Sequence, residues 1–93
     1  MANVKIRVPA PLQKMVGNKS EVPLSARTVA EALAALEAAY PGVKEKVCDE
    51  SGKVRKYLNL YVNDEDIRFL KGEGTELKDG DEVSIIPAIA GGR

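Results

Sequence analysis

One segment of this chain repeats its apolar residues at the spacing of an α-helix of about three turns. Thr28 and Glu31 form a capping box in front of it, and residues 41–42, Pro-Gly, end it. The residues that recur every three or four positions are Val29, Leu33, Leu36 and Tyr40. The chain is therefore expected to bury one face of a single main helix.

Shorter segments in which apolar and polar residues alternate surround this helix, and each predicts a β-strand. A hairpin through residues 17–18 joins the first two, and a tight turn through residues 64–65 joins the third and fourth. Residues 43–56 form a crossover with a short helical turn over 43–47, and residues 72–81 form a turn-rich link. The predicted strands are residues 3–8, 20–24, 57–63, 67–70 and 83–86.

The element order is strand, strand, helix, strand, strand, strand. It predicts an α+β fold in which a mixed sheet of about five strands carries the main helix on one face. A length of 93 residues is that of one domain. We expect this domain to span residues 1–87 and a flexible tail to follow over 88–93.

Alternation assigns the residues of each strand to the two faces of the sheet. The helix is expected to cover Val4, Ile6, Val8, Leu58, Leu60, Val62, Val83 and Ile85. The open face would carry Lys5, Arg7, Tyr57, Asn59, Tyr61, Ser84 and Ile86. Scattered apolar residues are common on ordinary surfaces. However, Arg7, Tyr57, Tyr61 and Ile86 are residue types typical of a docking patch, and Ile86 lies next to the tail.

Composition excludes several classes of function. Fourteen basic and fourteen acidic residues cancel, so neither a nucleic acid nor an anionic membrane is an expected partner. The N-terminus shows no signal peptide, which favours a cytoplasmic location. One cysteine and no histidine exclude an intrachain disulfide, a cysteine-rich zinc site and a histidine-based triad. We interpret Cys48 as a packed thiol and residues 64–66, Asp-Glu-Asp, as a solvated turn with no metal. Nothing indicates an enzyme active site.

In the last six residues, Ala88 to Arg93, the side chains are small or absent except at Ile89 and Arg93. Gly91 and Gly92 lack Cβ, so an extended tail through Ala90, Gly91 and Gly92 could thread into a narrow channel. A frayed terminus of no importance is the alternative.

Taken together, these features resemble the β-grasp fold of the ThiS/MoaD family of ubiquitin-like sulfur carrier proteins. The resemblance covers nearly the whole chain. Its most specific parts are residues 58–69, Leu-Asn-Leu-Tyr-Val-Asn-Asp-Glu-Asp-Ile-Arg-Phe, and the Ala-Gly-Gly segment that follows the last strand. Both are most similar to the CysO-like carriers of cysteine biosynthesis.

The resemblance implies that the Gly92 carboxylate is adenylated by an ATP-dependent enzyme and converted to a thiocarboxylate. It also implies delivery of the sulfur to a pyridoxal-phosphate (PLP)-dependent cysteine synthase and release of cysteine by a metal-dependent protease. ATP, PLP and the metal would belong to these partners, and this chain, a monomer when free, would bind none of them. Alternatives are a MoaD-like or ThiS-like carrier for molybdopterin or thiazole synthesis, a modifier joined to lysines through Gly92, and a regulatory β-grasp subunit.

Arg93 departs from the family pattern, in which Gly-Gly ends the chain. A charged side chain follows the residue whose carboxylate must react. One hypothesis is a precursor trimmed between Gly92 and Arg93 by a metal-dependent peptidase. The other is that the extra residue is tolerated.

Overall fold

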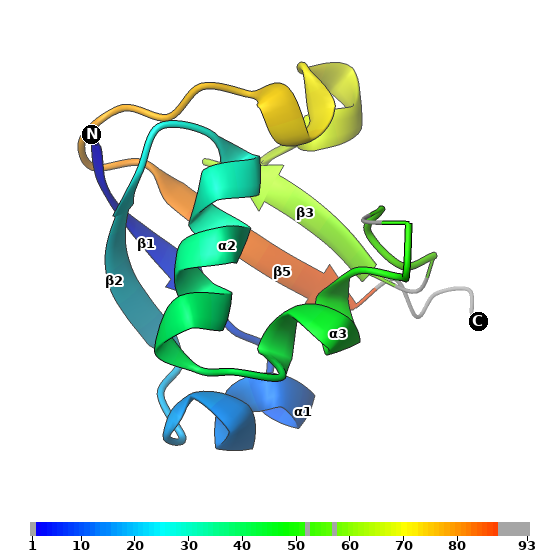
Figure 1. The fold of residues 1–93 in the computed structure, drawn as a ribbon. Helices are drawn as coiled ribbons and strands as arrows, with labels where there is room; N and C mark the ends of the chain where they lie inside the picture. Colours follow the sequence, from blue (N-terminus) through cyan, green and yellow to red (C-terminus); the bar gives the residue numbers. More distant parts are fainter. Residues whose placement is uncertain (1, 52, 57, 88–93) are drawn as a thin grey trace.

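The computed structural model describes residues 2–51, 53–56 and 58–87. In these residues, strands form one mixed sheet of order β2-β1-β5-β3-β4 (Figure 1). β1 and β5 are parallel, and the other neighbouring pairs are antiparallel. The strands are β1 (Ala2–Arg7), β2 (Glu21–Ala26), β3 (Leu58–Val62), β4 (Glu65–Asp66) and β5 (Glu82–Pro87).

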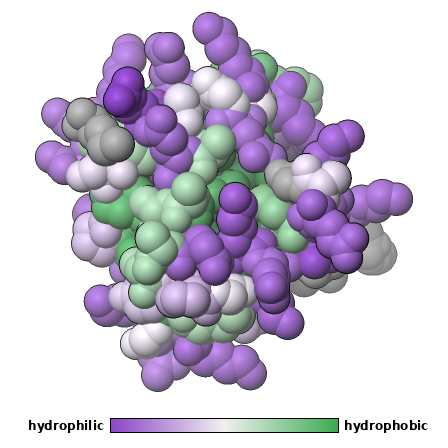
Figure 2. Space-filling model, in the orientation of Figure 1, coloured by the Kyte–Doolittle hydropathy of each residue, from purple (hydrophilic) through white to green (hydrophobic). Residues whose placement is uncertain are grey.

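The predicted main helix is confirmed as α2 (Val29–Ala39), which lies across one face of the sheet (Figure 1). Shorter helical segments are α1 (Ala10–Gln13), α3 (Val43–Val47) and the 3-10 turns η1 (Lys14–Val16), η2 (Ile67–Phe69) and η3 (Gly72–Gly74). The helical turn expected over 43–47 is therefore confirmed. Figure 2 shows the helix side, where hydrophilic residues surround a hydrophobic band that follows α2.

Side-chain and backbone hydrogen bonds fix the start of α2. The Glu31 amide donates to Oγ1 of Thr28 at 3.2 Å, as the capping box predicts. The Glu31 carboxylate reaches one residue further back than expected, to the amide of Arg27 at 3.0 Å. The first bond satisfies a donor that an uncapped helix would leave without a partner, and the second ties the residue before the cap to the first turn.

The core forms between α2 and the sheet, as the alternation predicted. Val29, Leu33 and Leu36 of α2 are buried, whereas Tyr40 is only partly buried. All eight sheet residues assigned to the helix side are buried: Val4, Ile6, Val8, Leu58, Leu60, Val62, Val83 and Ile85. The two periodicities, of the helix and of the strands, therefore meet in one apolar layer.

The first two strands pair antiparallel as predicted, but a longer connection than a hairpin turn joins them. Helices α1 and η1 occupy the connection, because Pro11 suits a first helical turn and Val16 is completely buried against the core. Gly17 and Asn18, with φ of 69° and 62°, then reverse the chain into β2. The second strand consequently begins at Glu21 and continues to Ala26, beyond the predicted end.

The predicted fourth strand over residues 67–70 is also wrong. Asn63 and Asp64 have φ of 52° and 78°, which makes them a two-residue turn and starts the pairing at Glu65. The Asp66 carboxylate then accepts the Arg68 amide at 2.8 Å and caps the 3-10 turn over Ile67–Phe69. That local bond offers the backbone an alternative to a strand ladder.

Glu37 joins the end of α2 to the start of α3. Its carboxylate accepts the amides of Gly42, at 3.0 and 3.2 Å, and of Lys44, at 2.8 Å. These bonds, that of Gly42 first, hold the pKa of the Glu37 carboxyl below its ordinary value. The left-handed Gly42, with φ of 100°, lets the chain turn tightly enough for one carboxylate to reach both amides.

The burial of Leu36 generates a first prediction. Leu36→Ala should lower the free energy of unfolding by about 2–5 kcal/mol, because a completely buried side chain leaves a cavity when it is truncated. Leu70→Ala removes the same atoms from an exposed position and should change stability by less than about 0.5 kcal/mol. Urea unfolding of both variants measures the difference, and equal losses would show that α2 is not the centre of the core.

The Glu37 bridge predicts a pH dependence of stability. Because its pKa is lowered in the fold, the ionised carboxylate stabilises the protein above the unfolded pKa of about 4.3. This stabilisation is lost as the pH falls through the folded value. Glu37→Gln should therefore unfold at lower urea than the parent at pH of about 7, and the gap should narrow toward pH of about 3. A gap of the same size at both pH values would contradict this role for the charge.

Candidate functional site

The strand that leads to the C-terminal tail lies in the middle of the sheet. β5 pairs with β1 on one side and with β3 on the other, and the Cα of Pro87 lies opposite that of Leu58. The tail, with Ala90, Gly91, Gly92 and Arg93, lies outside the described residues. The roles assigned to it stay predictions. The strand that leads to it is paired with β1 over Glu82, Val83 and Ser84 and with β3 as far as Pro87, so β3 holds the point from which the tail leaves the domain.

Strand pairing brings three of the four predicted docking residues together on the open face. Ser84 of β5 lies opposite Arg7 of β1 and opposite Tyr61 of β3, so these residues form one row across three strands. Ile86 lies in the next row on this face, opposite Asn59. The fourth predicted docking residue, Tyr57, lies outside the described residues.

This open-face patch, Arg7, Tyr61 and Ile86, is accessible. Ile86 is 40% exposed, and Tyr61 is half-buried. Nη1 of Arg7 lies 3.9 Å from Glu82, a long contact between partly exposed side chains that contributes about 0–1 kcal/mol at most. An apolar side chain beside an available guanidinium, one residue before Pro87, can contact a protein into which the tail extends.

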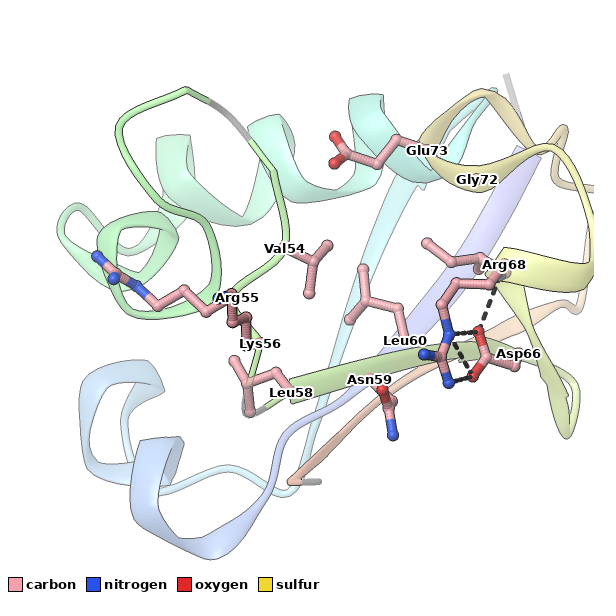
Figure 3. Close-up of a pocket in the computed structure, with 11 residues that line it drawn as sticks. Val54, Arg55, Lys56, Leu58, Asn59, Leu60, Asp66, Arg68, Gly72 and Glu73 are labelled. Carbon is pink, nitrogen blue, oxygen red and sulfur yellow. Dashed lines mark hydrogen bonds and ion pairs between the residues drawn. The ribbon is translucent and has the colours of Figure 1, made fainter. Parts of the chain in front are cut away.

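A hollow that the sequence does not predict lies along the outer edge of β3 and has a volume of about 270 Å³ (Figure 3). We call it the β3 groove. Its wall includes Asp66 and Arg68: Nε of Arg68 lies 3.1 Å from both carboxylate oxygens, and Nη2 lies 2.7 Å from Oδ2. The side-chain hydrogen bond from Arg68 lowers the pKa of Asp66, and Asp66 in turn raises the pKa of Arg68. Both groups are therefore charged at neutral pH.

Phe69, the residue after Arg68, is 78% exposed. The sequence signal was present, because Asp66 and Arg68 are two residues apart after a turn. A strand over residues 67–70, as predicted, would place Phe69 on the same face as the buried Ile67. The 3-10 turn instead leaves Phe69 in solvent.

The interpretation of Cys48 as a packed thiol is confirmed. It is 3% exposed within the core, and burial raises the pKa of the thiol, with the charges of Glu73 and Asp49 adding to the effect. The thiol is therefore protonated at neutral pH, the less reactive form.

The part of the chain that the structure describes contains neither a metal-binding cluster nor a membrane-spanning helix. Among residues 2–51, 53–56 and 58–87, no group of three or more histidine, cysteine, aspartate or glutamate side chains is placed to hold a metal ion. Over the same residues, no helix has the length and apolar character needed to cross a membrane.

Known proteins are similar to this chain in sequence and in fold. The CysO sulfur carrier protein of Mycobacterium tuberculosis is 42% identical over 92 residues, which cover 97% of this chain and 99% of the relative. The small archaeal modifier protein 3 of Haloferax volcanii is 37% identical and covers 96% of this chain and 98% of its own.

The solved structures agree. The chain matches the crystal structure of the Amycolatopsis orientalis BexX/CysO complex with a TM-score of 0.88 and 38% identity, over 96% of this chain and 99% of that one. These neighbours confirm the β-grasp fold, with its mixed sheet and one main helix on one face. The model of the ThiS family matches residues 6–92, which includes the Gly-Gly segment. This chain belongs to the ThiS family.

Proposed function

We propose that this protein is a sulfur carrier whose Gly92 carboxylate is converted to a thiocarboxylate that donates its sulfur for cysteine biosynthesis. The observation that carries the proposal is the continuous similarity to a CysO sulfur carrier over 97% of the chain. The ThiS family match, which runs to residue 92, supports the assignment of Gly92 as the reacting residue.

The chemistry explains why such a carrier needs a partner. A terminal carboxyl has a pKa of about 3.5, so at neutral pH it is an anion and a poor electrophile. Attack of a carboxylate oxygen on the α-phosphorus of ATP forms an acyl adenylate and releases pyrophosphate. Hydrosulfide then attacks the carbonyl carbon, the bond to AMP breaks and a proton is released, which leaves a thiocarboxylate. The partner enzyme supplies catalysis, and this chain supplies the carboxylate.

The position of β5 suits this division of labour. A fully extended chain from Pro87 to Gly92 would span about 17 Å at roughly 3.3 Å per residue, enough to reach a recessed active site. The body would stay outside, because β5 is held in the sheet by β1 over Glu82, Val83 and Ser84 and by β3 as far as Pro87. The open-face patch lies next to this point, where a partner that takes the tail would touch the domain.

We also propose three partner enzymes for this carrier. A CysO protein of Amycolatopsis orientalis forms a complex with BexX, so a protein similar to this chain docks on another protein. For this chain we propose an ATP-dependent adenylating enzyme, a PLP-dependent cysteine synthase and a metal-dependent protease. ATP, PLP and the metal are bound by these partners, and the carrier works in the cytoplasm as a monomer when free.

A second candidate is a protein modifier joined to lysines through Gly92. The observation in its favour is the 37% identity to a small archaeal modifier protein. A carrier and a modifier share the adenylated terminus and differ only in the nucleophile that attacks it, sulfur or a lysine amine. MoaD-like and ThiS-like roles remain alternatives for the acceptor, with less specific support.

The carrier proposal predicts a mass change. The chain ending at Gly92, incubated with the adenylating enzyme of its own host, ATP and a sulfur source, should gain the mass of one sulfur-for-oxygen exchange. The chain ending at Arg93 should gain it only after Arg93 is removed, if trimming precedes activation. The chain lacking Gly92 is the control.

Two outcomes would contradict the proposed role as a sulfur carrier. One is no exchange in the chain ending at Gly92. The other is that host extracts contain only conjugates that survive thiol reduction and denaturation, which would favour the modifier. Intact mass of protein from the native host decides the question of Arg93, because a sulfur-bearing form that retains Arg93 would reject trimming.

The open-face patch predicts a binding defect. Ile86→Ala and Arg7→Ala should each weaken binding to the adenylating enzyme by about tenfold, or about 1.4 kcal/mol, because both side chains are accessible next to the tail. Lys46→Ala, at an exposed position of α3, is the matched control and should bind like the parent. Titration calorimetry measures all three, and equal affinities would place the contact elsewhere.

A further inference from the structure

The edge of β3 that faces away from β5 is paired over only part of its length. β4 pairs with Tyr61 and Val62, whereas the register with β5 extends from Val62 back to Leu58. The β3 groove lies along the remaining residues, Leu58 to Leu60 (Figure 3). It therefore follows a length of strand edge that β4 does not cover.

The backbone of β3 is oriented to use this edge. The Asn63 amide donates to the carbonyl of Glu82 at 2.9 Å, and Asn63 follows the residue paired with Val83. In an antiparallel ladder, successive residues point their backbone groups to opposite sides. The backbone groups of Leu58 and Leu60 therefore point away from β5, toward the groove. The Leu58 amide already donates to the Arg55 carbonyl at 3.0 Å, so an extended segment laid there would use the Leu58 carbonyl and the Leu60 amide.

The other edge of the sheet is closed to such an addition. The Val8 amide donates to the Ser20 carbonyl at 2.9 Å, and with the β1–β2 register this points the even-numbered residues of β2 toward β1. Pro23 therefore faces the free edge, where it has no N–H to offer. Proline on an edge strand blocks pairing with a further strand. Strand addition is thus disfavoured at β2 and left open at β3.

The side chains around the groove select the chemistry of what it binds. Its apolar lining is formed by Val54, Leu58, Leu60 and Ile67, and its charged lining by Arg55, Lys56, Arg68, Asp66 and Glu73. Nε of Arg55 donates to the Glu45 carbonyl at 2.9 Å, and Figure 3 shows its side chain directed away from the edge of β3, so Lys56 and Arg68 are the cationic side chains at this edge, facing Asp66 and Glu73. In total, three cationic side chains in the lining outnumber its two carboxylates. The groove is therefore locally positive, although the whole chain has no net charge.

Arg68 adds a preorganised contact to the groove, next to an exposed aromatic residue that does not line it. The Arg68 side chain is 69% exposed and is held by Nε and Nη2 on Asp66, so its Nη1 makes no hydrogen bond or ion pair to any residue in the described ranges. Phe69, the next residue, is 78% exposed. Aromatic and arginine side chains are enriched at the centres of protein interfaces.

We propose that the β3 groove is a second docking surface, separate from the open-face patch, which binds an extended segment of a partner protein. The segment lies along Leu58 to Leu60 and places an apolar side chain against Val54 and Ile67. A carboxylate of the segment meets the cationic side of the groove, at Lys56 or Arg68. This surface does not depend on the sulfur chemistry of the tail.

The test uses the full-length, ¹⁵N-labelled chain and a blocked peptide, acetyl-Ile-Glu-Val-Asp-Ile-amide, followed by amide chemical shifts. Shifts are expected to cluster at Leu58 to Leu60 and at Ile67 and Arg68. Replacement of the acidic residues of the peptide by Gln and Asn should raise its Kd at least threefold. Shifts centred on Arg7 and Ile86, equal binding of the two peptides, or no shifts at millimolar peptide would each overturn the proposal.

Variants of exposed residues provide matched controls. Lys56→Gln and Arg68→Gln should each raise the Kd of the acidic peptide at least threefold, whereas Lys46→Gln, which removes the same charge from α3, should leave it unchanged. Arg68→Lys keeps the charge but loses the two-pronged contact with Asp66, and should weaken binding less than Arg68→Gln. Unchanged amide spectra away from the groove show that each variant is folded. Equal Kd values for Lys56→Gln and Lys46→Gln would reject the assigned site.

Discussion

The structure depends on the contact between the apolar face of α2 and the inner face of the sheet. A domain of this size has room for one core, and in the described residues six of the nine largest completely buried side chains come from these two layers. The contact joins residues that are far apart in the sequence, such as Leu36, Ile6 and Val83. Once it forms, it determines which strand faces remain in solvent, and so where a partner can touch the domain.

The central place of β5 links this core to function. Val83 and Ile85 are buried under α2, while the intervening Ser84 and the exposed Ile86 belong to the open face. The same strand therefore anchors the domain, contributes to the open-face patch and leads into the tail. Because β3 pairs with β5 as far as Pro87, the tail starts from a fixed point next to the open face. This geometry suits a carrier that presents its own carboxylate to other enzymes.

Part of the fold and site could be predicted because the signals are local. The cap at Thr28, the helical period from Val29 and the alternation in β3 each depend on residues a few positions apart, and each was confirmed. The connection between β1 and β2 failed because a buried Val16, which no nearby pattern reveals, holds a helical turn where a hairpin was expected. The fourth strand failed because the bond between Asp66 and the Arg68 amide outweighed a short alternating pattern. The β3 groove could not be predicted, since its walls come from three separate segments.

The sequence by itself determined the main helix, the strands β1, β3 and β5 with the buried face of each, and the family to which the chain is similar, because these follow from residue spacing and from the Gly-Gly segment. It also placed the candidate reacting group at Gly92. Only the tertiary structure decided that β5 lies between β1 and β3, that Arg7 and Tyr61 lie in one row on either side of Ser84, and that β3 keeps an uncovered edge while Pro23 blocks that of β2. Strand order and register arise from contacts between distant segments, and such contacts leave no periodic trace in the sequence.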